Sequence, residues 1–369
     1  MIIVITIVAY FLVLLGLSWL TSKGASNEKF FKANRKSPWY MVAFGMIGAS
    51  ISGVTFVSVP GMVLNNNMSY LQMCLGFVLG YVVIAYVLLP IYYKLNLTSI
   101  YTYLEERLGK YSYKTSASFF ILSKMSSAAV KFYVVCMILQ RFVLDQYHIP
   151  FFVTVSGLVL LIWLYTRKGG ICTLVYTDSF QTLCMFIALL LIIYKVMGAL
   201  DLSFIDTIHR VTNDYHSQIF VFDDWLSGQN FWKQFLSGVF IVIVMTGLDQ
   251  DMMQKNLTCK DLRSAQKDMC SYGLAFVPAN LLFLSLGILL MFFYAQLHLI
   301  IPTATSDELM LKATAGGLLG TPVVVFFTIG IVAACFSSAD SALTSLTTSY
   351  CVDIKNRADD EKLRKWVHF

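Results

Sequence analysis

The stretch GIVAACFSSADSALTSLTTSY, residues 330–350, is an apolar helix pattern that carries one polar stripe. At about 100° per residue, roughly a third of the helix circumference holds small and hydroxyl side chains: Ala334, Ser337, Ser338, Ser341, Thr344, Ser345 and Thr348. The opposite side holds Phe336, Leu343, Leu346 and Tyr350. Unpaired hydroxyls in hydrocarbon cost several kcal/mol, so the stripe must face either a packed neighbouring helix or an ion or solute path. Asp340 favours the path, because acids inside membrane helices are rare and mark functional sites.

The composition indicates a membrane protein with several spans. Of the 369 residues, 57% are apolar and 13% are charged, against about 25% charged residues in soluble domains. The net charge of +6 comes from basic residues in short loops, which indicates membrane topology and argues against a nucleic-acid partner. The eight cysteines and five histidines show no metal-binding or disulfide spacing. No nucleophile–base pair or phosphate loop is present, so an enzyme is not expected.

Nine apolar segments are long enough to be predicted as membrane helices. They are residues 2–21, 39–63, 69–93, 115–144, 150–166, 171–198, 232–254, 271–298 and 321–351. Of the 27 Lys and Arg residues, 20 fall in one set of alternate loops, five fall in the other set, and two lie within a helix. The positive-inside rule then predicts a multi-pass protein of the cell membrane, with an external N-terminus and a cytoplasmic C-terminus. The external loop 199–231 is expected to include an interfacial helix.

The second apolar segment is interrupted by small residues. Within nine positions it holds Gly45, Gly48, Ser50, Ser52 and Gly53, and a proline and a glycine follow. Gly and Pro weaken a helix, and unwound backbone at membrane depth is tolerated only where protein or a water-filled cavity satisfies it. In transporters with inverted repeats, such broken helices present free carbonyls to cations. The alternative is a kinked helix with a packing groove of small residues.

Other apolar segments contain charged residues. Asp178 lies about two turns into the sixth segment, while Asp249 and Asp251 end the seventh. Asp251 is interpreted as an ordinary interfacial carboxylate. Lys124 and Lys131 are seven residues apart and share one helix face. Lys124 is expected to extend to the cytoplasmic interface, while the deeper Lys131 is expected either to pair with an intramembrane acid or to contact a ligand.

Five motifs, taken together, resemble the sodium/solute symporter family, which includes the sodium/glucose cotransporters. They are PWYMVAFGMIGASISGVTF (38–56), NLTSIYTYLEERLG (96–109), GGICTLVYTDSFQ (169–181), GLDQDMMQKNLTCKDLRSAQKDM (247–269) and AACFSSADSALTS (333–345). The resemblance implies an all-α leucine-transporter fold in a single transmembrane domain, residues 1–369. It would comprise an extra N-terminal helix (2–21), a five-helix repeat (39–198), an inverted second repeat (232–351) and a cytoplasmic tail (352–369). The second repeat is expected to be incomplete within these residues, because family members continue through repeat helices nine and ten.

The resemblance also implies two cation sites. A sodium site would be formed by the backbone carbonyls of Gly48, Ile51 and Ala334 together with the hydroxyls of Ser337 and Ser338. A second site, which only some members have, would match Asp178, Ser337, Asp340 and Ser341. The family usually has Ser or Thr at the position of Asp340, and the alternative for this acid is a structural pair with a basic residue such as Lys131.

For the solute, the resemblance implies contacts from Ser50, Thr55, Gln72 and Asp249, to which the helix pattern adds Lys131. The expected activity is sodium-coupled uptake of a small polar solute by alternating access. A sugar, a sialate-like acid and another organic acid all remain open as the solute. The alternative from a different class is a membrane protein that senses a solute without transporting it. The expected partners are sodium ions, the solute and the lipid bilayer.

Overall fold

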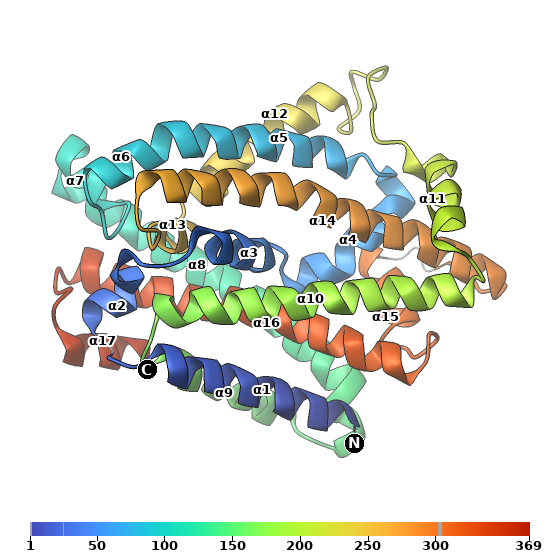
Figure 1. Ribbon diagram of the computed structural model, residues 1–369, viewed down its shortest axis with the longest axis horizontal. Coiled ribbons are helices and arrows are strands. Elements are labelled where there is room, and N and C mark those ends of the chain that lie inside the picture. The colour runs from blue at the N-terminus through green and yellow to red at the C-terminus, as the bar shows by residue number, and fades with distance from the viewer. Residues whose placement is uncertain (1, 25, 302–304) are drawn as a thin grey trace.

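The computed structural model describes residues 2–24, 26–301 and 305–369 and is all-α over this range (Figure 1). Among these residues there is no β-strand, only an isolated bridge between Ser37 and Cys259. The predicted all-α class is therefore confirmed.

Five helical spans are long and apolar enough to cross a membrane: Tyr70–Lys94, Lys110–Leu139, Ile171–Ala199, Leu262–Gln296 and Thr321–Ile354. The first comprises α5 (Tyr70–Val83), the π-helical turn η2 (Ile84–Leu88) and α6 (Leu89–Lys94). The next three are α8, α10 and α14, and the last is α16 (Thr321–Ser349) with its π-helical end η7 (Tyr350–Ile354). Two bent helix pairs raise the number of candidate spans in the described chain to seven. The other two predicted segments form shorter apolar helices, α1 (Ile2–Thr21) and α9 (Phe151–Thr166). All nine segments are thus helical, while nine membrane crossings stay a prediction.

The first bent pair is the predicted broken helix. α3 (Trp39–Ser50) and α4 (Gly53–Asn66) meet at 66°. At the junction Ile51 leaves the helical region with φ −82° and ψ 83°, and Ser52 caps α4 by accepting a hydrogen bond from the Thr55 amide. The Ser52 amide turns back to the Ser50 carbonyl at 3.1 Å. The last turn of α3 therefore ends with carbonyls that the helix itself no longer engages.

The second bent pair corrects the prediction of one continuous helix over 232–254. α12 (Phe231–Val242) and its π-helical end η6 (Ile243–Gly247) stop before Asp249, and α13 (Gln250–Asn256) starts at 74° to them. Asp249 caps α13, because its Oδ1 accepts hydrogen bonds from the amides of Asp251 and Met252 at 2.8 and 3.2 Å. A glycine followed by an N-cap aspartate is a recognisable end-and-restart signal.

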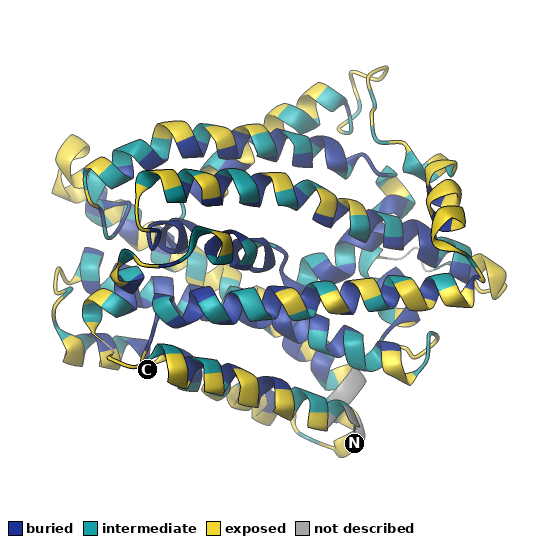
Figure 2. Ribbon diagram, viewed as in Figure 1, coloured by how far each residue is buried: buried dark blue, intermediate teal, exposed yellow. Residues whose placement is uncertain are grey.

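The two breaks lie in the middle of the bundle. α3 packs against α10 (Ile171–Ala199) and α14 (Leu262–Gln296), and α10 also packs against α16 (Figure 1). A Cβ on Gly48 would lie 2.0 Å from Thr182 Oγ1 of α10, and one on Gly45 would lie 3.0 Å from Asp178 Cβ. The small residues of α3 therefore make a packing groove as well as the break. Every residue of α13 is buried (Figure 2).

The remaining helices surround this centre. α1 and α9 pack together along one edge, beside α8 (Lys110–Leu139) with its π-helical end η3 (Gln140–Leu144) and the 3-10 turn η4 (Asp145–Tyr147). Short peripheral elements are α7 (Thr102–Leu108), α11 (Phe204–Thr212), η5 (Tyr215–Ser217) and α15 (Ser306–Ala313). α11 is the helix predicted within loop 199–231; its placement at a membrane interface stays a prediction.

The segment after α1 and the C-terminal helix meet at one end of the bundle. α2 (Asn27–Lys32), followed by η1 (Ala33–Arg35), packs near the last helix, α17 (Glu361–His368), where the Arg364 guanidinium lies 4.6 Å over the Phe30 ring. His368 is buried between the hydroxyls of Thr166 and Thr347, at 3.0 and 2.9 Å. Burial, and secondarily the nearby Arg364, lower the pKa of His368 to about 3. The last helix is therefore docked with a neutral histidine.

Candidate functional site

A cavity of about 680 Å³ lies beside both helix breaks. Its walls come from α3, α5, α8, η6, α13, α14 and α16. Much of its lining is apolar or aromatic: Tyr70, Met73, Phe77, Tyr81, Tyr101, Phe120, Met252 and Phe276. A few polar groups converge on it: Ser50, Lys124, Lys131, Asp249, Asp251, Tyr272 and Ser338. Apolar walls with a few placed polar groups are typical of a small-molecule site.

The charged groups of the cavity are only partly paired. Lys124 Nζ lies 2.6 Å from Asp251 Oδ2 and 3.4 Å from Asp249 Oδ2. Lys124 therefore does not extend to an interface as predicted, and Asp251, only 6% exposed, is not an ordinary interfacial carboxylate. Lys131 lines the cavity without an ion pair to any acid of the described chain. The predicted alternative of pairing Lys131 with an intramembrane acid such as Asp340 is not found there.

Three of the five predicted solute contacts line the cavity: Ser50, Lys131 and Asp249. Ser50 Oγ is hydrogen-bonded to the hydroxyl of Tyr272, which also accepts a hydrogen bond from the Tyr81 hydroxyl at 2.7 Å. The sequence did not identify Tyr81 and Tyr272 as site residues, because their position beside the helix break depends on how α5 and α14 pack.

The other two predicted contacts, Gln72 and Thr55, are not among the described residues that line the cavity. The Gln72 amide is completely buried and holds loop 199–231, donating to the Gln229 carbonyl at 2.9 Å and accepting from the Val221 amide at 3.0 Å. Thr55 belongs to the cap of α4, with its hydroxyl 3.1 Å from Ser52 Oγ. Both side chains are thus engaged by the fold, and their contact with the solute stays a prediction.

Of the predicted sodium ligands, Ser338 and Ala334 lie where α16 crosses the end of α3. Ser338 Oγ donates to the Ala49 carbonyl at 3.2 Å and to the Ala334 carbonyl at 3.3 Å. Ala49 directly follows Gly48, and Ile51 caps the same helix. Ser337 instead donates to Asp178 Oδ1 at 3.0 Å. One hydroxyl and two carbonyls, those of Ala49 and Ala334, therefore meet beside the break. Such neutral oxygen groups are ligands that a small hard cation prefers.

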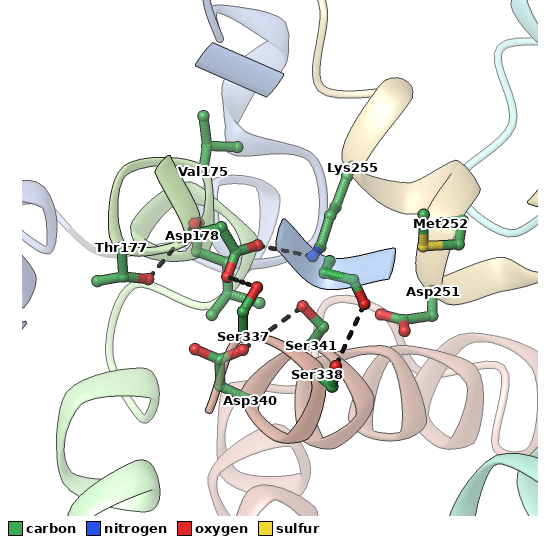
Figure 3. A network of polar contacts seen from close by, with 12 residues as sticks. Val175, Thr177, Asp178, Asp251, Met252, Lys255, Ser337, Ser338, Asp340 and Ser341 are labelled. Atoms are coloured by element: carbon green, nitrogen blue, oxygen red, sulfur yellow. Dashed lines mark hydrogen bonds and ion pairs between the residues drawn. The ribbon is translucent and has the colours of Figure 1, made fainter. Parts of the chain in front are cut away.

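A second polar cluster surrounds Asp178 of α10 (Figure 3). The Lys255 ammonium of α13 points at this carboxylate, with Nζ 2.6 Å from Oδ2, and both side chains are almost completely buried. Sequence reasoning placed Lys255 in a cytoplasmic loop, which is wrong. The i,i+4 spacing of Asp251 and Lys255 is a signal that the helix continues through this region.

Asp340 of α16 lies in the same cluster and is completely buried. The Tyr165 hydroxyl of α9 donates to Asp340 Oδ2 at 2.7 Å, and Ser341 Oγ lies 3.5 Å from Oδ1. The structure thus gathers all four residues predicted for the second cation site, Asp178, Ser337, Asp340 and Ser341, and adds a lysine to them.

Two apolar helices are broken near a central cavity, and α16 presents small and hydroxyl side chains to one of the breaks. This arrangement is typical of membrane transporters with broken helices. The comparison with known families agrees. The chain belongs to the sodium:solute symporter family, whose model matches residues 30–364. The predicted family is therefore confirmed.

Similar proteins and structures support this membership. The chain is 27% identical over 338 residues to the rabbit (Oryctolagus cuniculus) sodium-dependent multivitamin transporter, covering 87% of this chain and 50% of that protein. It is 23% identical over 363 residues to the sodium/sialic acid symporter NanT of Aliivibrio fischeri, covering 92% and 68%. The human (Homo sapiens) sodium/iodide cotransporter matches at 25% identity over 65% of this chain and 37% of its own length. The chain thus spans about a third to two thirds of these relatives.

The fold is similar to a solved structure of a Na⁺-coupled sialic acid symporter in a substrate-bound, outward-open state. The TM-score is 0.87 at 20% identity, and the match covers 100% of this chain and 79% of that chain. The two proteins therefore share their arrangement of helices.

Proposed function

We propose that this protein is a sodium-coupled symporter that takes up a small organic anion by alternating access. The observation that carries the proposal is Lys131, which lines the cavity without an ion pair to any acid of the described chain. The other charged groups in the lining, Lys124, Asp249 and Asp251, are already linked to one another. A negatively charged solute would supply the missing partner of Lys131, with Ser50 as a further contact. Asp249 would accept hydrogen bonds from hydroxyl or amide groups of the solute, away from its negative charge.

Sodium is proposed to bind at the end of α3, between the carbonyls of Gly48, Ile51 and Ala334 and the hydroxyls of Ser337 and Ser338. Support comes from Ser338, which contacts the break through the Ala49 carbonyl and also lines the cavity. Bound sodium would thus lie next to the solute, so that each would favour the binding of the other. A second cation is proposed at Asp178, Ser337, Asp340 and Ser341.

The names of several relatives favour an anion over a sugar. Three kinds of similar protein are named for iodide, sialic acid or monocarboxylates. All of these solutes carry negative charge at neutral pH. One charge that crosses 100 mV supplies about 2.3 kcal/mol. Two sodium ions would therefore drive accumulation of a monovalent anion, because the net movement of one positive charge still follows the membrane potential.

The membrane arrangement is proposed as nine spans with an external N-terminus, in the cell membrane. The repeats would be residues 39–198 and 232–351, between an extra helix at 2–21 and a cytoplasmic tail at 352–369. Support comes from the two breaks, since the first helix of each proposed repeat is bent in its middle, by 66° and 74°. Paired interruptions of this kind are typical of inverted repeats.

Uptake into proteoliposomes tests the proposal. The full-length protein is reconstituted and offered radiolabelled monocarboxylates, sialic acid and neutral sugars, with and without an inward sodium gradient. We expect gradient-driven uptake of at least one acid and none of the sugars. Uptake of a sugar alone would refute the anion proposal, and binding without gradient-driven uptake would indicate a sensor instead of a transporter.

A further inference from the structure

The half-helix α13 is held by two ion pairs of opposite polarity. Asp251, at its start, pairs with Lys124 of α8, and Lys255, one turn later, pairs with Asp178 of α10, each at 2.6 Å. The first pair lies in the wall of the cavity and the second lies in the polar cluster beside α16. α13 is therefore the element that connects the proposed solute site with the proposed second cation site.

The polar cluster contains fewer cations than acids. Asp178 and Asp340 are both buried, and Lys255 is the ammonium group that stands next to Asp178. Asp340 receives hydroxyl hydrogen bonds but no ion pair among the described residues. Since a buried, unpaired carboxylate is costly, Asp340 is neutralised either by a proton or by one further cation that enters the cluster.

Asp178 can serve two cations only if these cations lie close to each other. Its Oδ1 faces Ser337 and its Oδ2 faces the Lys255 ammonium (Figure 3). A sodium ion that draws on Asp178, Ser337 and Ser341 would lie close to that ammonium, and the two like charges would repel each other in a medium of low dielectric constant. Lys255 and a second sodium are therefore competitors for one carboxylate.

We propose that Lys255 is a tethered cation that neutralises Asp178 until a second sodium ion binds there, and that this sodium releases Lys255 and so loosens α13 from α10. This inference rests on the second cation site of the proposed function. The released ammonium has an acceptor on its own helix, because Asp251 lies one turn earlier on the same face. Lys255 is thus a positioning residue that transmits cation binding to the wall of the cavity.

The test is a sodium titration of the full-length protein in nanodiscs, at constant ionic strength in mixtures of sodium and choline chloride. Lys255→Met removes the tethered charge, while Lys255→Arg keeps it. We expect Lys255→Met to bind its second sodium at least about tenfold more tightly, since a competitor worth about 1.4 kcal/mol or more is lost. Its Tm should fall in choline and recover in sodium, whereas Lys255→Arg should resemble the parent in both salts.

The outcomes separate this inference from the proposed function. The role of Lys255 alone would be overturned by the following result. The parent responds to sodium, but the Tm of Lys255→Met falls equally in both salts and its sodium titration is unchanged. A parent without any sodium response would remove the proposed function as well. If Lys255→Met unfolds in choline, refolding in sodium supports the inference, and unfolding in both salts contradicts it. As a charge-neutral control, the double variant Asp178→Asn, Lys255→Met should keep only the sodium response of the first site.

Discussion

Replacing Lys131 with methionine removes a cavity ammonium group that forms no ion pair within the described chain. The side chain keeps its length and its apolar stem, so the packing of α8 changes little. Because Lys131 has no ion pair in the described structure, its loss breaks none. We therefore expect Lys131→Met to reduce anion binding while the Tm stays close to that of the parent.

The size of the effect follows from the charges around the cavity. Lys124 and Lys131 balance Asp249 and Asp251 in number, so the Lys131→Met cavity carries one excess negative charge. Two opposite charges 4 Å apart attract by about 4 kcal/mol at an effective dielectric constant of about 20. Desolvation of the lysine offsets part of this, and hydrogen bonds to charged groups contribute about 1.5–3 kcal/mol net. The affinity for an anion should therefore fall about 10- to 100-fold.

Lys124→Met is the matched control, since it removes the same charge from the same helix face. Lys124 is paired with Asp249 and Asp251, so its loss should lower stability by about 1–3 kcal/mol as well as weaken binding. Binding is measured by scintillation proximity or calorimetry on the purified proteins, and Tm by thermal unfolding. Anion affinity that is unchanged in Lys131→Met, or an equal loss for a neutral sugar, would refute the reasoning.

The remaining predictions concern the first sodium site, the break of α3 and the docked C-terminal helix. Ser338→Ala should weaken sodium binding more than tenfold with little change in Tm, because its hydroxyl is the group that reaches the break; an unchanged sodium titration would count against this site. Gly48→Ala should cost about 1–3 kcal/mol of stability, since its Cβ would lie 2.0 Å from Thr182 Oγ1. The double variant Gly48→Ala, Thr182→Ala should recover part of the lost Tm, and no recovery would mean that the clash is elsewhere. The pKa of His368 is lowered to about 3 from about 6.5 in the unfolded chain, so the unfolded state binds the proton first and stability should fall as the pH drops from 7 toward 4. Thermal unfolding should show this slope in the parent and less of it in His368→Gln, and equal slopes would exclude this histidine as the cause.

The sequence by itself determined the class of fold, the family and one of the two helix breaks. Runs of apolar residues are local and produce helices wherever they occur in a membrane. The cluster of glycine and serine before Gly53 disfavours a continuous helix through its own backbone chemistry. The polar stripe of α16 was also readable, because helical periodicity places Ser337, Ser338 and Ser341 on one face. These features depend on residues that are near one another in the chain.

Only the tertiary structure decided which charges meet. Lys255 and Asp178 belong to different helices and are far apart in the chain, and no local pattern distinguishes a loop lysine from one that turns inward to a buried acid. Gln72 was placed in the solute site by resemblance, but its amide serves the loop at Val221 and Gln229. The physical reason is the same in both cases: a buried charge or amide must find a partner, and which partner lies within reach is set by how whole helices pack.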